Sequence, residues 1–159
     1  IALAISCGPS LVIADEPTTA LDVTIQAQVL DLLDQMRREL DLALLFITHD
    51  LEVVGDFCDR AVVMYAGDVV ERGDSQAIVE APAHPYARGL IDAVPKDRES
   101  RARLTPIPGT VPQIGAWPQG CRFAPRCTRA DARCSERPEL RPGERSDIRC
   151  WHPIGEDGR

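Results

Sequence analysis

The run Leu11-Val12-Ile13-Ala14-Asp15-Glu16 is the strongest indication of the fold class. A short apolar run that ends in two carboxylates is typical of a buried strand whose end reaches the edge of the sheet. A second apolar run occupies residues 42–47. Between the two runs, apolar residues recur at helical spacing over residues 24–40, and Asp22 stands where a helix cap is expected. Strand, helix and strand in this order predict a right-handed parallel crossover, and therefore an α/β fold whose strands are buried on both faces.

Shorter elements are expected after this crossover. Asp50 is expected to cap a helix that ends near Phe57, and residues 60–66 and 68–72 read as a β-hairpin that turns at Gly67. Two further helices are predicted over residues 74–80 and 84–93.

The composition changes at residue 95. From there to the end the chain is rich in proline and has little periodic apolar pattern. This composition predicts an irregular segment that needs a cross-link or a bound metal in order to fold. We therefore expect two parts, residues 1–80 and residues 81–159.

Charge is distributed unevenly along the 159 residues. The net charge is -7, yet residues 1–80 carry 4 basic against 15 acidic side chains, whereas residues 81–159 carry 14 against 10. The arginines of the second half stand singly among acidic residues, and no aromatic residues alternate with them. We therefore expect a solvated surface and no nucleic-acid partner. No apolar run approaches the roughly 20 residues that a membrane-spanning helix requires.

The acidic pair is the start of a longer motif. The run Asp15-Glu16-Pro17-Thr18-Thr19-Ala20-Leu21-Asp22 is followed, after the second apolar strand, by Thr48-His49-Asp50. These residues resemble the Walker B strand, the D-loop and the switch histidine of the ABC-transporter ATPases. The resemblance implies the parallel sheet of a P-loop NTPase, with ATP and Mg²⁺ as ligands.

The resemblance also implies roles for four residues. Asp15 would hold Mg²⁺, Glu16 would polarise the attacking water as general base, and His49 would contact the γ-phosphate. Asp22, in the D-loop, would lie near the nucleotide at the interface with a second ATPase subunit. Asp15, Asp22 and His49 are thus the expected nucleotide-site residues, and Glu16 and His49 the expected catalytic ones.

Two motifs of these ATPases do not occur in the sequence. There is no G-x-x-x-x-G-K-[ST] phosphate loop, and no Leu-Ser-Gly-Gly-Gln-type signature precedes Leu11. The chain therefore looks like the C-terminal part of a longer protein. We expect ATPase activity of the full-length protein and none of the 159-residue chain alone.

Four clustered cysteines follow the pattern Cys121-x5-Cys127-x6-Cys134-x15-Cys150. No secretion signal precedes them, so a metal is favoured over disulfides. The spacing lacks the C-x₂-C pairs of a zinc ribbon, and four thiolates without an assisting histidine suit an iron-sulfur centre, although zinc and free thiols remain open.

This tail, together with His84-Pro85-Tyr86 and the run Pro106-Ile-Pro-Gly-Thr-Val-Pro112, resembles the C-terminal extension of the oligopeptide/dipeptide importer ATPases, a group that includes nickel importers. The resemblance implies a [4Fe-4S] cluster on the four cysteines. It also implies a peripheral position on the cytoplasmic face of the cell membrane, and as partners a second ATPase subunit, membrane permeases and an external substrate-binding protein.

Three alternatives remain beside a peptide importer. The chain could belong to an importer of nickel or another small solute, to a soluble ABC ATPase without a transport role, or to a metal-cluster module that is regulatory rather than catalytic.

The motif His84-Pro85-Tyr86 also has a purely structural interpretation, since Pro85 suits the first turn of a helix and Tyr86 would then be a packing residue.

Overall fold

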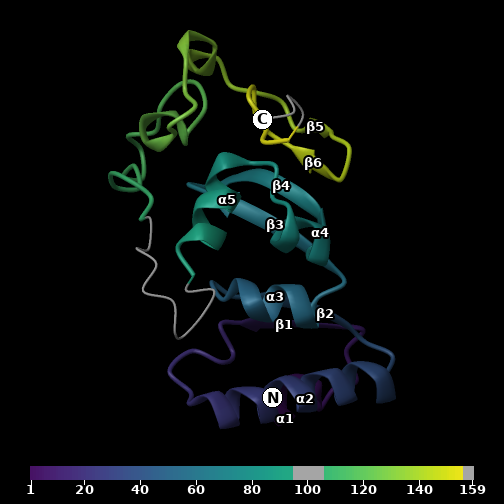
Figure 1. Ribbon diagram of the computed structural model, residues 1–159. Coiled ribbons are helices and arrows are strands. Elements are labelled where there is room, and N and C mark those ends of the chain that lie inside the picture. The colour runs from purple at the N-terminus through teal and green to yellow at the C-terminus, as the bar shows by residue number, and fades with distance from the viewer. Residues whose placement is uncertain (95–105, 156–159) are drawn as a thin grey trace. The chain divides into compact units, whose positions relative to one another are not determined.

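The computed structural model describes residues 1–94 and 106–155 (Figure 1). The chain forms two compact units, Ile1–Asp50 and Leu51–Arg159. This division reflects which residues contact one another in space. The boundary expected near residue 80 is of another kind, because it separates the segment with the ATPase-like motifs from the proline-rich and cysteine-rich extension. That boundary stays a prediction.

The first unit contains the predicted crossover. Its elements are α1 (Ala2–Ile5), β1 (Leu11–Asp15), α2 (Val23–Glu39) and β2 (Ala43–Ile47). Strands β1 and β2 pair in parallel, with Leu11 opposite Ala43 and Asp15 opposite Ile47. The α/β fold class is therefore confirmed.

The sequence predicted that both faces of the two strands are buried, and the structure differs. Val12 and Ala14 are buried, but Ile13 is 62% exposed and Leu45 is 49% exposed. Side chains alternate between the faces of a strand, and the one crossover helix of this unit can cover only one side of the pair. The expectation was wrong for this chain because a continuous apolar run does not reveal which helices or strands of the chain are available to cover it.

The start of α2 is fixed by a side chain. The Oδ1 atom of Asp22 accepts hydrogen bonds from the backbone N–H groups of Thr24 and Ile25, each at 3.0 Å. Such a cap satisfies amides that have no partner inside the helix, and it stabilises a helix by about 1 kcal/mol. The predicted cap is confirmed, and it sets the path of the chain between β1 and α2.

The second unit is built on an antiparallel sheet. Its elements, in chain order, are α3 (Leu51–Phe57), β3 (Arg60–Tyr65), β4 (Asp68–Asp74), α4 (Ser75–Glu80), α5 (Pro85–Asp92), the 3₁₀ turns η1 (Ala124–Arg126) and η2 (Ala132–Ser135), β5 (Arg141–Pro142) and β6 (Ser146–Ile148). The predicted hairpin is present as β3 and β4, joined at Ala66 and Gly67, which both have positive φ. Two left-handed residues in a two-residue turn match the twist of paired strands.

The tail is less irregular than the sequence suggested. Strands β5 and β6 extend the hairpin into a four-stranded sheet in the order β3-β4-β6-β5. Gly73 lies opposite Ser146, and a Cβ on Gly73 would sit only 3.0 Å from the Cβ of Ser146. The two backbones can approach this closely because residue 73 is glycine. Apart from these two short strands and the turns η1 and η2, the described part of the tail is irregular, as the sequence predicted.

The core of the second unit joins the hairpin to the tail. It contains Val63, Tyr65, Val70, Ile78, Ala87 and Phe123. The rings of Tyr65 and Phe123 meet edge to face with centroids 5.1 Å apart, and Tyr86 packs against both. Tyr86 is thus a packing residue in the helix that begins at Pro85, as the simpler interpretation of that motif predicted.

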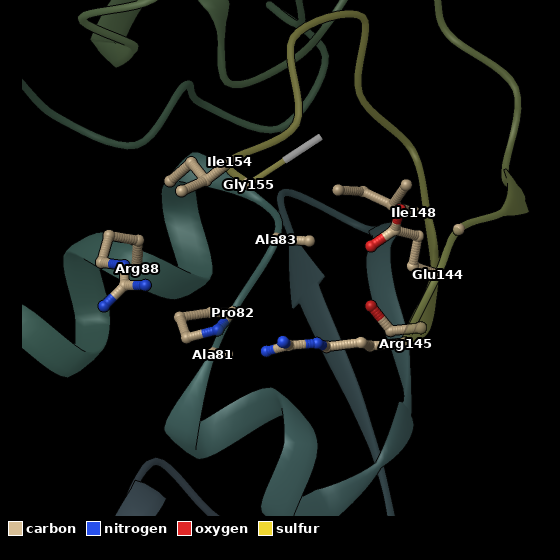
Figure 2. A pocket seen from close by; sticks show the side chains of 11 residues that line it. Ala81, Pro82, Ala83, Arg88, Glu144, Arg145, Ile148, Ile154 and Gly155 are labelled. Atoms are coloured by element: carbon tan, nitrogen blue, oxygen red, sulfur yellow. The ribbon is translucent and has the colours of Figure 1, made fainter. Parts of the chain in front are cut away.

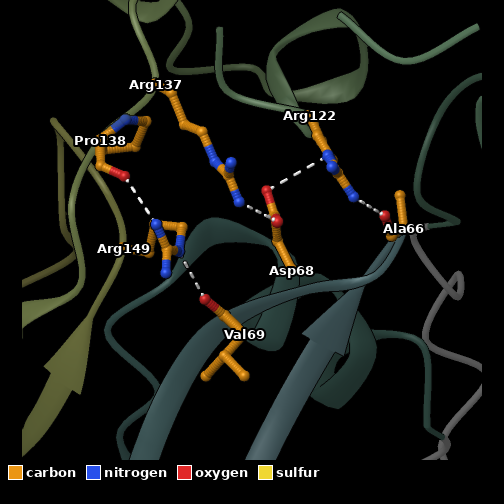
Figure 3. A network of polar contacts seen from close by, with 7 residues as sticks. All are labelled: Ala66, Asp68, Val69, Arg122, Arg137, Pro138 and Arg149. Carbon is orange, nitrogen blue, oxygen red and sulfur yellow. Dashed lines mark hydrogen bonds and ion pairs between the residues drawn. The ribbon is translucent and has the colours of Figure 1, made fainter. Parts of the chain in front are cut away.

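Charged side chains fasten the same two segments (Figure 3). The carboxylate of Asp68, on β4, contacts Arg137 at 2.5 Å and Arg122 at 3.3 Å. The guanidinium of Arg149 donates to the carbonyl of Val69 at 2.9 Å and to that of Pro138 at 3.0 Å. Because Asp68 is buried, its charge needs these partners, and the contacts hold the tail in one register against β4.

Among residues 1–94 and 106–155, no helix is long and apolar enough to cross a membrane.

Candidate functional site

The predicted catalytic pair meets at the carboxyl ends of β1 and β2. The backbone N–H of Glu16 donates to the carbonyl of Ile47 at 2.8 Å, which continues the parallel pairing one residue past β1. His49 follows two residues after Ile47, at the end of the neighbouring strand. Parallel strands deliver the residues after their ends to the same edge, and the Nδ1 atom of His49 lies 3.4 Å from Oε1 of Glu16.

The backbone and one neighbour orient Glu16. Its φ angle is +46°, so the chain leaves the strand through a left-handed conformation that is uncommon outside glycine. The hydroxyl of Thr19 donates to Oε2 at 2.9 Å. Hydrogen bonds from Thr19, and then from His49, lower the pKa of Glu16. The carboxylate is therefore ionised at neutral pH, which is the form that a general base requires.

Both members of the pair are accessible. The side chain of Glu16 is 48% exposed and that of His49 is 76% exposed. Their oxygen and nitrogen atoms thus face open space in this chain, where a water molecule or a phosphate group can approach. The role of Thr19 escaped the sequence analysis, because a threonine three residues after an acid has no distinguishing signal.

The other two predicted nucleotide residues lie close by in sequence. Asp15 is exposed at the last position of β1, directly before Glu16. Asp22 directs Oδ1 to the first amides of α2, so both hydrogen bonds of the cap use one oxygen. Gln26, one turn into α2, donates to Oδ2 of Asp50 at 3.3 Å and so ties this helix to the segment after β2.

The four clustered cysteines gather in the second unit. Cys134 and Cys150 are buried, and Cys121 and Cys127 are half-buried. Burial raises the pKa of Cys150 to about 12, and the other three thiols add to this increase. Burial also raises the pKa of Cys121 and of Cys127. The tail therefore brings the four sulfur atoms into one region.

Backbone amides point at three of these sulfur atoms. Cys150 accepts from the N–H of His152 at 3.3 Å. Backbone hydrogen bonds from Phe123 and Ala124 act on Cys121, and one from Arg129 acts on Cys127, and each lowers the pKa of its thiol. Amide donors of this kind stabilise a thiolate and tune the metal that it holds.

The spacing of the sulfur atoms tests which metal fits. In a tetrahedral zinc site with bonds of about 2.3 Å, neighbouring sulfur atoms lie about 3.8 Å apart. Within the described part of the chain, no three cysteine sulfur atoms come within 4.8 Å of one another. As placed in this structure, the four thiols are therefore not gathered closely enough for one zinc ion to bind three of them. Among the described residues, the close group of three potential ligands comprises Asp131, Cys134 and His152.

A glycine allows the cysteine region to close. The backbone N–H of Cys121 donates to the carbonyl of Cys134 at 3.0 Å. A Cβ added at Gly120 would lie 2.3 Å from that carbonyl oxygen. Only glycine fits at this position without a backbone shift, and the sequence alone gave no reason to single it out.

The second unit also has a small cavity of about 150 Å³ (Figure 2). It lies between the connection from α4 to α5 and the turn from β5 to β6. Arg88 enters its lining from α5 and Arg145 from the turn. None of the residues predicted from the sequence to act in catalysis or metal binding lines it.

Comparison with known proteins places the chain in a family. Residues 70–134 match the family described as "Oligopeptide/dipeptide transporter, C-terminal region". The chain is 47% identical to the oligopeptide transport ATP-binding protein OppD of Haemophilus influenzae over 95% of its own length. It is also 47% identical to the dipeptide transport ATP-binding protein DppD of Escherichia coli, over its whole length.

The chain belongs to the oligopeptide/dipeptide transport ATP-binding protein family. It spans about half the length of these relatives, 47% of the first and 49% of the second. Among solved structures, cbiO1 from Clostridium perfringens, part of the ABC transporter complex cbiONQ, is 33% identical, with a TM-score of 0.43 over 46% of this chain and 29% of that one.

Membership of this family agrees with the resemblance found in the sequence. The matched region begins in β4 and ends at Cys134, so it includes the His84-Pro85-Tyr86 motif and three of the four clustered cysteines. It leaves out Glu16 and His49, whose segment is covered by the similarity to the two transport proteins.

Proposed function

We propose that this chain is the C-terminal part of the ATP-hydrolysing subunit of an ABC importer that powers uptake of oligopeptides or dipeptides. One observation carries the proposal: Glu16 and His49 lie 3.4 Å apart at the ends of paired parallel strands. The same chain carries the oligopeptide/dipeptide C-terminal region. The first feature supports ATP hydrolysis, and the second supports the substrate class.

The chemistry assigned to this edge is activation of a water molecule. Glu16 accepts the proton of the attacking water through Oε1, while Thr19 holds Oε2 and keeps the carboxylate in one orientation. His49, beside Oε1, contacts the γ-phosphate and positions it for in-line attack. Asp15 holds Mg²⁺, which neutralises charge on the phosphate oxygens when it is bound.

The remaining requirements of the reaction are met by other segments and subunits. A phosphate loop and a signature motif, neither of which occurs in this sequence, would hold the nucleotide between two ATPase subunits, and Asp22 would lie at their interface. The dimer would act on membrane permeases from the cytoplasmic face of the membrane. An external binding protein would supply the peptide.

Uptake by whole cells tests the substrate class. Cells whose own gene is disrupted would receive the full-length gene with or without Glu16→Gln, and accumulation of labelled dipeptide, tripeptide and Ni²⁺ would be measured. We expect peptide uptake from the unmodified gene and only background uptake from the variant, with Glu39→Gln, on the exposed end of α2, as the matched control. Restored Ni²⁺ uptake without peptide uptake would favour the nickel alternative, and no change in either would favour a soluble ATPase.

We further propose that Cys121, Cys127, Cys134 and Cys150 hold a [4Fe-4S] cluster. Three observations support this choice over a single zinc ion: the four cysteines converge, no three of their sulfur atoms form a close group among the described residues, and backbone N–H groups donate to three of the sulfur atoms. Anaerobic purification followed by iron, sulfide and zinc analysis tests it. Four iron and four sulfide per chain with broad visible absorption are expected for this cluster, whereas colourless protein with one zinc on the four thiols would overturn the proposal.

A further inference from the structure

A group of three different ligand types lies beside the cysteine region. The side chains of Asp131, Cys134 and His152 offer an oxygen, a sulfur and a nitrogen atom that all lie within 4.8 Å of one another. The Nε2 atom of His152 is 2.9 Å from Oδ1 of Asp131. We propose that these three residues form a binding site for a single zinc-like divalent cation, which overlaps the four-cysteine site at Cys134.

The imidazole nitrogen is the first argument for this site. Nε2 of His152 is buried and makes no well-aligned hydrogen bond with a described residue, despite its short distance to Asp131. A buried polar atom without a well-aligned hydrogen bond is unfavourable, because its lost hydration is not fully compensated. A cation placed among the three atoms would satisfy this nitrogen through its lone pair, which a misaligned carboxylate does not.

The local fold presents the three ligands together. Asp131 caps the turn η2, accepting from the N–H of Arg133 at 2.9 Å, and the N–H of Cys134 donates to the carbonyl of Asp131 at 3.1 Å. One tight turn therefore carries both the carboxylate and the thiol. His152 comes from a segment nearly twenty residues further along, just after β6.

Contacts that involve no ligand atom hold His152 against this turn. The guanidinium of Arg133 lies 4.1 Å from the ring centroid of Trp151, and the Trp151 indole N–H donates to the carbonyl of Glu136 at 3.0 Å. The site is thus organised before any ion binds, which reduces the ordering cost of coordination.

The ligand set selects the class of ion. A thiolate, an imidazole and a carboxylate are the three ligand types of zinc, and three protein ligands leave a fourth position for water. Two ligands bonded at about 2.0–2.1 Å in a tetrahedral site lie about 3.4 Å apart, so Asp131 would have to move by about half an ångström. Its side chain is 53% exposed, which leaves room for this movement, although Oδ1 also accepts from the N–H of Arg133.

The proposed cluster and this ion are alternative occupants, because both use Cys134. The inference does not rest on the proposed transport function or on the cluster, and its test must exclude the cluster. A variant of the 159-residue chain with Cys7, Cys58, Cys121, Cys127 and Cys150 changed to Ser keeps Cys134 as its one thiol. It cannot assemble a four-thiolate cluster.

Titration of this variant with Co²⁺ and then Zn²⁺ tests the site. We expect one Co²⁺ per chain with a thiolate-to-cobalt charge-transfer band that Zn²⁺ displaces. His152→Gln or Asp131→Asn in the same background should weaken binding by at least about tenfold. The control Asp92→Asn, an exposed carboxylate on α5, should not change it. A band that persists unchanged without His152 and Asp131 would overturn the proposal.

A second measurement works on the unmodified chain, in case the multiple variant does not fold. The sequence has three histidines, His49, His84 and His152, so the imidazole nitrogen NMR spectrum has three side chains to follow. In cluster-free protein, one equivalent of Zn²⁺ should shift the nitrogen signal of His152 and leave that of the buried His84 in place. An unshifted His152 signal in zinc-loaded protein would contradict the site.

Discussion

The hydroxyl of Ser146 donates to Oε1 of Glu71 at 2.7 Å, between two buried residues that are 75 positions apart. The same carboxylate accepts from the backbone N–H groups of Ala83 and His84, at 2.9 and 2.8 Å. Glu71 therefore joins strand β4, the connection before α5, and strand β6. A buried carboxylate without a cationic partner depends on such donors, because nothing else compensates for its lost hydration.

Ser146→Ala should destabilise the second unit by about 1–3 kcal/mol, since it removes a buried hydrogen bond to a charged group. Chemical denaturation followed by circular dichroism measures this loss. Ser135→Ala is the matched control, because the Ser135 hydroxyl is exposed and bonds only to the nearby carbonyl of Ala132. Equal stability of the two variants would contradict the organising role of Glu71.

His84 should make the stability of the chain depend on pH. The ring is fully buried, its Nδ1 accepts from the N–H of Tyr86 at 3.0 Å, and burial lowers its pKa from 6.5 to about 4. Below about pH 6.5 the unfolded chain binds a proton that the folded chain does not bind until about pH 4. The free energy of unfolding should therefore fall as the pH drops through this window, by up to about 3 kcal/mol.

Denaturant titrations at pH 7, 5.5 and 4.5 measure this dependence. His84→Gln, which has no titrating side chain, should be less stable at pH 7 and should lose the part of the slope that belongs to His84. His49→Gln is a suitable control, since His49 is exposed in the first unit. A slope that is the same with and without His84 would show that folding does not lower the pKa of this ring.

Gly120→Ala should disrupt the cysteine region, because the new Cβ would lie 2.3 Å from the carbonyl oxygen of Cys134 and 2.5 Å from the backbone of Ser135. We expect a loss of several kcal/mol, or failure to fold, as for other overpacked sites. Gly55→Ala in α3 is the counterpart, since its Cβ would meet only the Val79 side chain at 3.4 Å. That change should be neutral or stabilising by up to about 1 kcal/mol. Thermal unfolding compares the two.

The sequence was a good guide wherever a long periodic or apolar run met a specific motif. The run at residues 11–16 and the helical spacing after Asp22 predicted a parallel crossover, and β1, α2 and β2 confirm it. Glu16 and His49 could be named in advance because their motifs resemble those of the ABC-transporter ATPases, and they meet because parallel strands end at one edge.

Other features depended on contacts between distant residues, which leave no local pattern. Strands β5 and β6 are too short to show a period, and Glu71 looks like an ordinary acidic residue of a hairpin until Ser146 and His84 meet it. The grouping of Asp131 and His152 around Cys134 likewise arises only when the two segments fold together. Most of the contacts that the sequence did not reveal join residues 13 to 75 positions apart.

ATP turnover by the full-length protein tests whether Glu16 is the general base, with Glu16→Gln compared with the unmodified protein and with Glu39→Gln. We expect that Glu16→Gln still binds ATP but hydrolyses it about 10²–10⁴-fold more slowly, because it has lost the general base beside His49. Glu39→Gln should retain full activity. Hydrolysis by Glu16→Gln at the unmodified rate, with ATP binding intact, would contradict the assignment of this edge as the hydrolytic site.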